Sequence, residues 1–153
     1  MWTKERNFMI YNQLINRVLN LAYDAHNGQK DKSGVPYIFH PYHLAEQMNT
    51  QDEVITALLH DVLEDTKTTV DEIRNIGVGE DIIEALQLLT HDKKTPYLDY
   101  VANLKDNVLA KKVKLADLRH NSDESRLEAD NEFTRKRREK YAKAIQILTQ
   151  GDE

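Results

Sequence analysis

The ten residues ALLHDVLEDT, at positions 57–66, show the spacing of an α-helix and contain several candidate functional residues of this chain. An α-helix advances about 100° per residue. Over positions 53–64 this rotation gathers the apolar side chains on one half of a helix and the polar ones on the other. The segment therefore predicts an amphipathic helix whose polar half carries one imidazole and three carboxylates, from His60, Asp61, Glu64 and Asp65.

This polar face has two interpretations when the helix is taken alone. Its side chains either form a solvated acidic surface or line a cavity, where they converge on a cation. His40 also has two interpretations, because aromatic and aliphatic residues surround it in the run Tyr37-Ile38-Phe39-His40-Pro41-Tyr42. A histidine in such a run is often a hydrogen-bonded core residue, but imidazole is also a common metal ligand.

Asp117 lies in an expected helix, over residues 107–121, that has apolar residues around much of its circumference. Such a helix is largely buried, and an ionised aspartate inside it costs several kcal/mol unless it is paired or metal-bound. The sequence therefore leaves two possibilities for Asp117. One is a salt bridge to a nearby Lys or Arg, and the other is a bond to a metal ion.

Together these residues form a coherent candidate metal site. Two imidazoles and two carboxylates would come from His40, His60, Asp61 and Asp117. This mixed nitrogen and oxygen donor set suits Mn²⁺, Fe²⁺ or Zn²⁺ better than Ca²⁺. Four protein ligands leave positions open for substrate and water, and the nearby carboxylates of Glu64 and Asp65 are suited to orient or deprotonate that water.

The rest of the chain also reads as helical. Glycine and proline are scarce, at five and three residues, which argues against an all-β fold with many tight turns. Asp52 is suited to cap the helix over residues 53–64, and Thr69 begins a capping box with Glu72. No repeat or linker is found, so we expect one all-α domain over residues 1–153, with seven to nine helices. The other expected helices span residues 7–25, 41–48, 69–77, 81–89, 96–105, 107–121 and 132–149.

The composition narrows the classes of function. With 40% hydrophobic and 31% charged residues, the chain has a globular composition. The absence of cysteine excludes disulfides, thiolate metal sites and a cysteine nucleophile. A net charge of −5 argues against general nucleic-acid binding. No signal peptide or apolar run of the ~18–20 residues that span a bilayer is found, so we expect a soluble cytoplasmic protein without a membrane partner. The oligomeric state is left open.

The motifs, taken together, resemble those of the HD-domain phosphohydrolases. Within that family the chain looks most like the hydrolase domain of RelA/SpoT proteins and their small stand-alone relatives. The resemblance spans roughly residues 20–148, and its segments follow the family's order. They are residues 25–29 (AHNGQ), 32–41 (KSGVPYIFHP), 57–66 (ALLHDVLEDT), 113–117 (VKLAD) and 120–121 (HN).

This resemblance implies a role for each matching residue. His40, His60, Asp61 and Asp117 match the metal ligands, and the family's metal is usually Mn²⁺. Glu64 and Asp65 match the acidic pair that positions water and takes part in catalysis. Contacts to a nucleotide substrate are implied for Lys32, Ser33, Asn121, Arg137 and Tyr141. The reaction implied is removal of the 3′-diphosphate from (p)ppGpp, which yields GDP or GTP and pyrophosphate.

The chain departs from the family's pattern at two places. Asp31 stands where the family often has an arginine, and Leu118-Arg119 stands where the order is usually Arg-Leu. A shift of one residue rotates a helical side chain by about 100°, so Arg119 does not take over the family's role. These changes leave two alternatives to consider: a phosphatase for another phosphorylated nucleotide, such as NADPH, and a non-catalytic metal-binding regulatory module.

Overall fold

Short polar side chains cap the N-termini of most of the helices that the structure describes. In the computed structural model, which describes residues 10–151, five helices begin after a residue whose side chain accepts a hydrogen bond from the backbone N–H three positions later. This bond satisfies one of the N–H groups that the first helical turn leaves without a partner. The five capping residues are Asn12, Thr50, Thr69, Asn107 and Asn131.

The described residues divide into two compact units between Thr90 and His91, and each unit is described by itself. The first contains α1 (Gln13–Ala25), α2 (Phe39–Glu46), α3 (Gln51–Leu59), α4 (Val62–Asp65), α5 (Val70–Asn75) and α6 (Glu80–Leu89). The second contains α7 (Tyr97–Asn103), α8 (Val108–Ser125) and α9 (Glu132–Thr149). Within residues 10–151 the β-structure amounts to one isolated bridge between Lys30 and Pro36, so the predicted all-α fold is confirmed.

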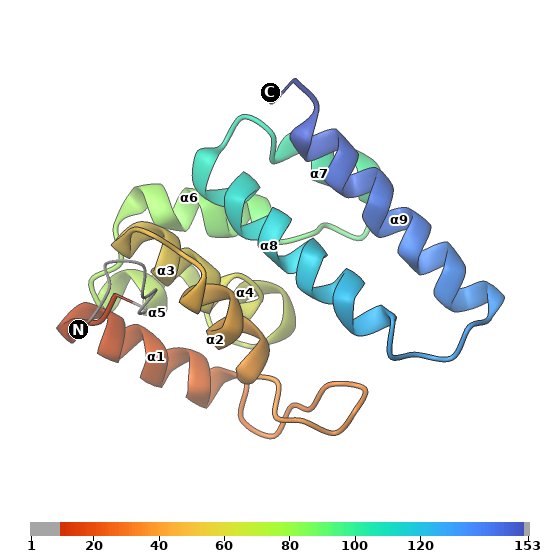
Figure 1. Ribbon diagram of the computed structural model, residues 1–153. Coiled ribbons are helices and arrows are strands. Elements are labelled where there is room, and N and C mark those ends of the chain that lie inside the picture. Colours follow the sequence, from red (N-terminus) through yellow and green to blue (C-terminus); the bar gives the residue numbers. More distant parts are fainter. Residues whose placement is uncertain (1–9, 152–153) are drawn as a thin grey trace, which may run out of the picture. The chain divides into compact units, whose positions relative to one another are not determined.

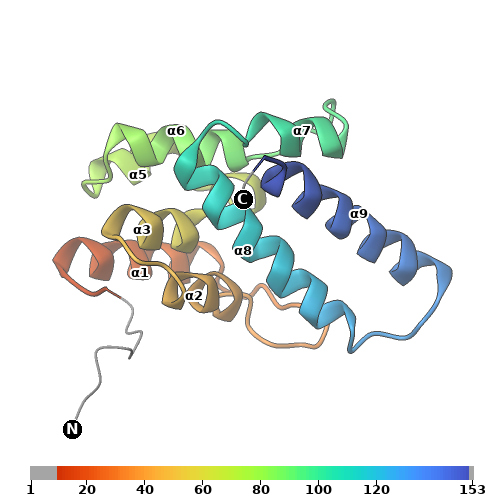
Figure 2. The same cartoon turned by 45° about the horizontal axis from the view of Figure 1, so that its top comes forward.

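Helix α3 forms the centre of the first unit. Residues 54–59 are all fully buried, and α3 packs against α1, α2 and α6 (Figures 1 and 2). Burial of a single Val, Leu or Ile side chain contributes about 1.5–3 kcal/mol, so this run holds α3 firmly in place. His60 follows the last residue of α3 and is itself only 3% exposed. The core therefore fixes the position at which the His-Asp pair begins.

The helix expected over residues 53–64 is in fact two helices. The backbone leaves regular helical geometry at Asp61, which has φ −107° and ψ 0°, and α4 begins at the next residue. The predicted cap is also wrong, because Thr50 and not Asp52 accepts the N–H of Glu53. Thr50 takes this role because its backbone is extended, whereas Asp52 already lies inside the first turn of α3.

Other boundaries in the first unit shift by a few residues. The helix expected over residues 7–25 begins at Gln13, where Asn12 caps it, and residues 7–9 lie outside the described part of the chain. The helix expected over residues 41–48 corresponds to α2, which begins two residues earlier, at Phe39, and ends at Glu46. The earlier start is possible because proline is tolerated within the first turn of a helix. The cap predicted at Thr69 is confirmed, since its hydroxyl accepts the N–H of Glu72, and that hydroxyl also lies 3.3 Å from Oε1 of Glu72.

The second unit is built around a pair of long helices. Helices α8 and α9 pack side by side and run in opposite directions, and α7 packs against α9 (Figures 1 and 2). The bounds predicted for α9 are confirmed, whereas α8 extends beyond the predicted Asn121 to Ser125. Arg138 of α9 donates to the backbone carbonyl and the hydroxyl of Ser125, and thereby satisfies an acceptor in the last turn of α8.

None of the helices among the described residues combines the length and the hydrophobicity that crossing a bilayer requires.

Candidate metal centre

Three predicted ligands come together in the first unit. His40, His60 and Asp61 each offer one ligand atom, and these three atoms lie within 4.8 Å of one another. His40 is the second residue of α2, while the other two lie between α3 and α4. Two imidazole nitrogens and one carboxylate oxygen are donors that suit first-row divalent metals. The donor set and its spacing therefore fit a divalent cation.

His60 is held in one orientation by its own helix. Its Nδ1 lies 2.7 Å from the carbonyl oxygen of Ala57. A carbonyl oxygen only accepts hydrogen bonds, so Nδ1 carries the proton and Nε2 presents its lone pair when the ring is neutral. That Nε2 lies 3.0 Å from Oδ2 of Asp61. Two electron-rich atoms so close are stabilised by a positive charge between them, either a proton on the ring or a cation bound to both.

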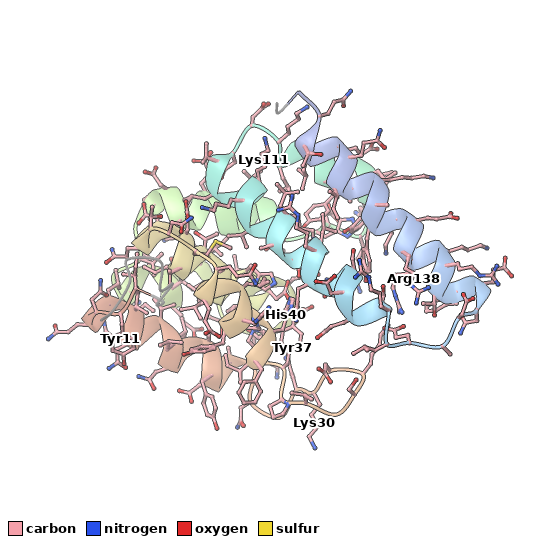
Figure 3. The ribbon with its side chains drawn as sticks, in the orientation of Figure 1. Tyr11, Lys30, Tyr37, His40, Lys111 and Arg138 are labelled. Carbon is pink, nitrogen blue, oxygen red and sulfur yellow. The ribbon has the colours of Figure 1, made fainter. Side chains whose placement is uncertain are left out.

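Tyr37 is a neighbour of the cluster that the sequence did not assign to any role. Its hydroxyl donates a hydrogen bond to Oδ2 of Asp61. Its ring centroid lies 5.6 Å from that of His40, and Figure 3 shows the two labelled side chains close together. The rings of His40 and His60 are in turn 5.3 Å apart. Tyr37 therefore orients the carboxylate of a candidate ligand from outside the candidate ligand set.

Replacement of this hydroxyl gives a direct prediction. Tyr37→Phe keeps the ring but removes the donor to Asp61, and we expect the affinity for Mn²⁺ to fall by about 10–100-fold. Competition against a fluorescent chelator would measure this change. Tyr23→Phe is the matched control, because Tyr23 is 60% exposed on α1. Equal affinities in the wild type and both variants would remove Tyr37 from the support of the site.

Glu64 and Asp65, the predicted catalytic pair, lie on the short helix α4. Both side chains are exposed, and the backbone N–H of Asp65 donates to the carbonyl of Asp61 over 2.9 Å. The same short segment therefore carries one candidate ligand and two carboxylates that solvent can reach. Such carboxylates can accept a proton from water, which is the chemistry predicted for them.

The loop that carries Lys32 and Ser33 is built by Asp31. Oδ1 of Asp31 accepts the backbone N–H groups of Ser33 at 2.8 Å and Val35 at 3.0 Å. This is the local turn that aspartate side chains favour. Gly34 has φ +83°, a conformation open to glycine at little cost. The carboxylate that departs from the family's pattern therefore shapes the loop, while the two predicted substrate-binding side chains remain exposed.

Asp117 lies on α8 in the second unit, and its predicted burial is confirmed at 5% exposure. Of the two possibilities left open for Asp117, the salt bridge is present: Oδ2 accepts from Nζ of Lys114 at 3.0 Å. Oδ1 accepts the side-chain amide of Asn121 at 3.2 Å. Burial by itself lowers the pKa of Lys114, but Asp117, with Tyr100 and Tyr97, outweighs burial and holds that pKa well above its usual range. The assignment of Asp117 as a fourth metal ligand stays a prediction.

The four basic side chains of residues 135–138 do not share one partner. Arg135 and Lys136 are exposed and pair with Asp130 and Glu132, respectively. Arg137, the predicted substrate contact, forms an ion pair with Glu128. Its Cζ lies 5.4 Å from the centroid of the Phe133 ring. Tyr141 is half-buried one turn later, and burial raises the pKa of its hydroxyl. Substrate contacts by Arg137, Tyr141 and Asn121 stay predictions.

Three further residues contact candidate site residues or one another, and the sequence analysis did not single them out: Lys114, His26 and Gln29. Lys114 precedes Asp117 by three positions on one helix, a spacing at which side chains meet, so this pair was detectable. His26 and Gln29 lie in the motif AHNGQ, which carried no individual assignments. His26 is 2% exposed, and burial lowers its pKa despite the opposing effect of Gln29. Its contacts depend on how the loop folds back, which the sequence pattern does not show.

Comparisons with known proteins agree with this arrangement. A family model described as "HD domain" matches residues 18–120. A guanosine-3′,5′-bis(diphosphate) 3′-pyrophosphohydrolase from Aquifex aeolicus is 40% identical over 54% of this chain and 12% of its own length. The corresponding enzyme MESH1 from Danio rerio is 34% identical over 67% of this chain and 64% of its own length. The chain thus spans less than two thirds of either relative.

A solved structure supports the fold itself. It is described as a metazoan ortholog of SpoT that hydrolyses ppGpp and plays a role in starvation responses. It superposes with a TM-score of 0.75 at 23% identity, over 93% of this chain and 88% of that one. The fold, the His-Asp cluster and the extent of the family match lead to one conclusion: the chain belongs to the HD domain family.

Proposed function

We propose that this protein is a metal-dependent hydrolase that removes the 3′-diphosphate from (p)ppGpp and releases pyrophosphate. The observation that carries this proposal is the convergence of His40, His60 and Asp61, with two exposed carboxylates following on α4. The names of the relatives supply the substrate, since both relatives described above are named guanosine-3′,5′-bis(diphosphate) 3′-pyrophosphohydrolase. We further propose that residues 1–153 act as one domain, because the family match over residues 18–120 crosses the boundary at Thr90.

Membership of the HD domain family implies that the chain binds a divalent metal, and the cluster fits one. We assign Mn²⁺ as the metal, with Fe²⁺ and Zn²⁺ as alternatives that the same donors accept. Asp117 is proposed as the fourth ligand because residues 113–117 match the family's last metal motif. When bound, the cation would polarise the phosphoryl group and lower the pKa of a water.

In this proposal, side chains of the protein position the attacking water and bind the substrate. Glu64 and Asp65 hold the attacking water through hydrogen bonds, and one carboxylate takes its proton. Lys32 and Ser33, exposed on the loop that Asp31 shapes, donate to phosphate oxygens. On the second unit the proposed substrate contacts are Asn121, Arg137 and Tyr141. A phosphate that binds Arg137 would compete with the carboxylate of Glu128 for the guanidinium group.

One observation favours a different nucleotide as the substrate. The family's loop often carries an arginine at the position of Asp31, and here the carboxylate is used to build the turn. The loop at this position therefore lacks the planar cation that would stack on a base. A phosphatase that acts on another phosphorylated nucleotide, such as NADPH, keeps the same metal chemistry and is the second candidate.

The test is a product assay. The purified protein is incubated with ppGpp and Mn²⁺, with and without a chelator, and GDP and pyrophosphate are measured. Chelator-sensitive formation of both products is the expected result. If protein shown to bind metal releases neither product, the substrate assignment is wrong, and a panel that includes NADPH decides whether the second candidate holds. If metal-loaded protein is inert toward the whole panel, the proposal of an enzyme fails, and a binding module remains.

A further inference from the structure

The end of helix α4 is tied to a residue from a distant part of the first unit. Helix α4 has only four residues, too few for a helix to be stable by itself. Its own bonds are local, such as those from the N–H and the hydroxyl of Thr66 to the carbonyl of Val62. The carbonyl of Asp65 instead accepts a hydrogen bond at 3.0 Å from the side-chain amide of Gln29, 36 positions earlier in the chain.

The amide of Gln29 is itself oriented by His26. Oε1 of Gln29 lies 2.9 Å from Nδ1 of His26. Because the carbonyl of Asp65 only accepts, the NH₂ group of Gln29 must face it, and Oε1 must then face the imidazole. Nδ1 of His26 therefore carries a proton. This assignment agrees with a neutral ring, since His26 is only 2% exposed and its Nε2 has no hydrogen-bond partner among residues 10–151.

Gln29 is also fixed through its backbone. Its N–H donates to the carbonyl of His26 at 3.0 Å, and its carbonyl accepts the N–H of Tyr37 at 2.9 Å. Tyr37 is the residue whose hydroxyl contacts Asp61. Main-chain and side-chain bonds thus hold Gln29 on several sides, and a side chain anchored in this way can hold another segment in place.

We propose that Gln29, oriented by His26, is a positioning residue that holds the backbone of Asp65 and so aims the carboxylates of Glu64 and Asp65. The two bonds from His26 to Gln29 and from Gln29 to Asp65 are called the Gln29 bridge. This inference rests on the proposed function, because the Gln29 bridge can affect turnover only if Glu64 and Asp65 act on the attacking water. A displacement of about 1 Å at a reacting group costs about 10²-fold in rate.

The bridge predicts a loss of turnover without a loss of metal. In Gln29→Met the side chain keeps its length but cannot bond at either end, and in Gln29→Glu an acceptor faces the carbonyl of Asp65. We expect kcat to fall by about 10²-fold in both variants. KM and the metal content should stay close to those of the wild type. Gln87→Met makes the same change at an exposed position on α6 and serves as the control.

The imidazole is tested by a rescue. His26→Phe keeps a ring but removes the donor, whereas the side-chain amide of His26→Asn places a donor close to the position of Nδ1. We expect kcat to fall in His26→Phe and to recover in His26→Asn. A residue that only fills the core would give the opposite order, because phenylalanine fills the space of the ring better than asparagine does. That opposite order would overturn the role of His26.

A readout independent of activity completes the test. Amide hydrogen exchange of Asp65 and Thr66 in metal-free protein should accelerate on the order of tenfold in Gln29→Met, because the end of α4 opens more easily. Wild-type exchange and wild-type kcat in this variant would overturn the proposal, and so would a loss of metal in place of a loss of kcat. If wild-type protein hydrolyses no nucleotide, the proposed function fails, while exchange still decides whether the bridge holds α4.

Discussion

Asp61→Asn is expected to lower the hydrolysis of ppGpp by about 10³-fold or more. A bound cation contributes several kcal/mol to the stabilisation of charge in a phosphoryl-transfer transition state, and each 1.36 kcal/mol is about tenfold in rate. The carboxamide keeps the shape of Asp61 and an oxygen that can accept from Tyr37, but it removes the negative charge that lies 3.0 Å from Nε2 of His60. The loss is thus electrostatic rather than steric.

The measurement pairs kinetics with metal binding. kcat/KM is determined at saturating Mn²⁺, and the metal content per chain is determined by elemental analysis. A ligand that binds only the folded state raises the melting temperature, so Mn²⁺ should stabilise the wild type and should fail to stabilise Asp61→Asn. Asp99→Asn, at an exposed position on α7, is the control for loss of one surface charge. Undiminished metal content in Asp61→Asn would exclude Asp61 as a ligand.

The helices were largely predictable because their signals are local. The acceptor side chain of Thr69 and the scarcity of glycine and proline are signals of this kind, because each acts within a few residues. The break between α3 and α4 was not predictable in this way, since neither His60 nor Asp61 is a helix-breaking residue. Apolar periodicity continues through the break, so the pattern of residues 53–64 describes a single helix where the chain forms two.

The candidate site likewise has features that the sequence predicted and features that it did not. His40, His60 and Asp61 were identified by residue type and motif order, and the structure brings them together. The contacts that support them were not identified, because Tyr37 and Gln29 reach Asp61 and Asp65 across 24 and 36 positions of chain. Such contacts depend on the path that a loop takes back to a helix, and the spacing of residues along the sequence does not predict that path. Asp117 is an intermediate case, since its burial was predicted while its two possible roles stayed open.

The two roles of Asp117 can be separated through Lys114. The ion pair is well buried, with side-chain exposures of 14% for Lys114 and 7% for Asp117. Removing one partner of such a pair leaves an uncompensated buried charge and costs about 3–5 kcal/mol. We therefore expect Asp117→Asn and Lys114→Met each to lower the free energy of unfolding of the metal-free protein by roughly this amount. Denaturant unfolding measures both values.

The double variant Asp117→Asn/Lys114→Met is the decisive protein. It removes both charges, so most of the lost stability should return, as replacement of a buried ion pair by neutral groups is often neutral or stabilising. If Asp117 is a ligand, metal affinity and hydrolysis should stay low in this restored protein. Lys114→Met should bind Mn²⁺ at least as tightly as the wild type, because no ammonium group then competes for Oδ2 of Asp117.

The opposite pattern would assign Asp117 to the ion pair alone. In that case the double variant would recover metal affinity and turnover together with stability, and the cation would be held without Asp117. Stability and metal affinity respond to different atoms in this comparison, so a variant that merely unfolds cannot imitate the loss of a ligand. If Asp117 is the fourth ligand, the double variant should bind metal as weakly as Asp117→Asn does. It should also be about as stable as the wild type.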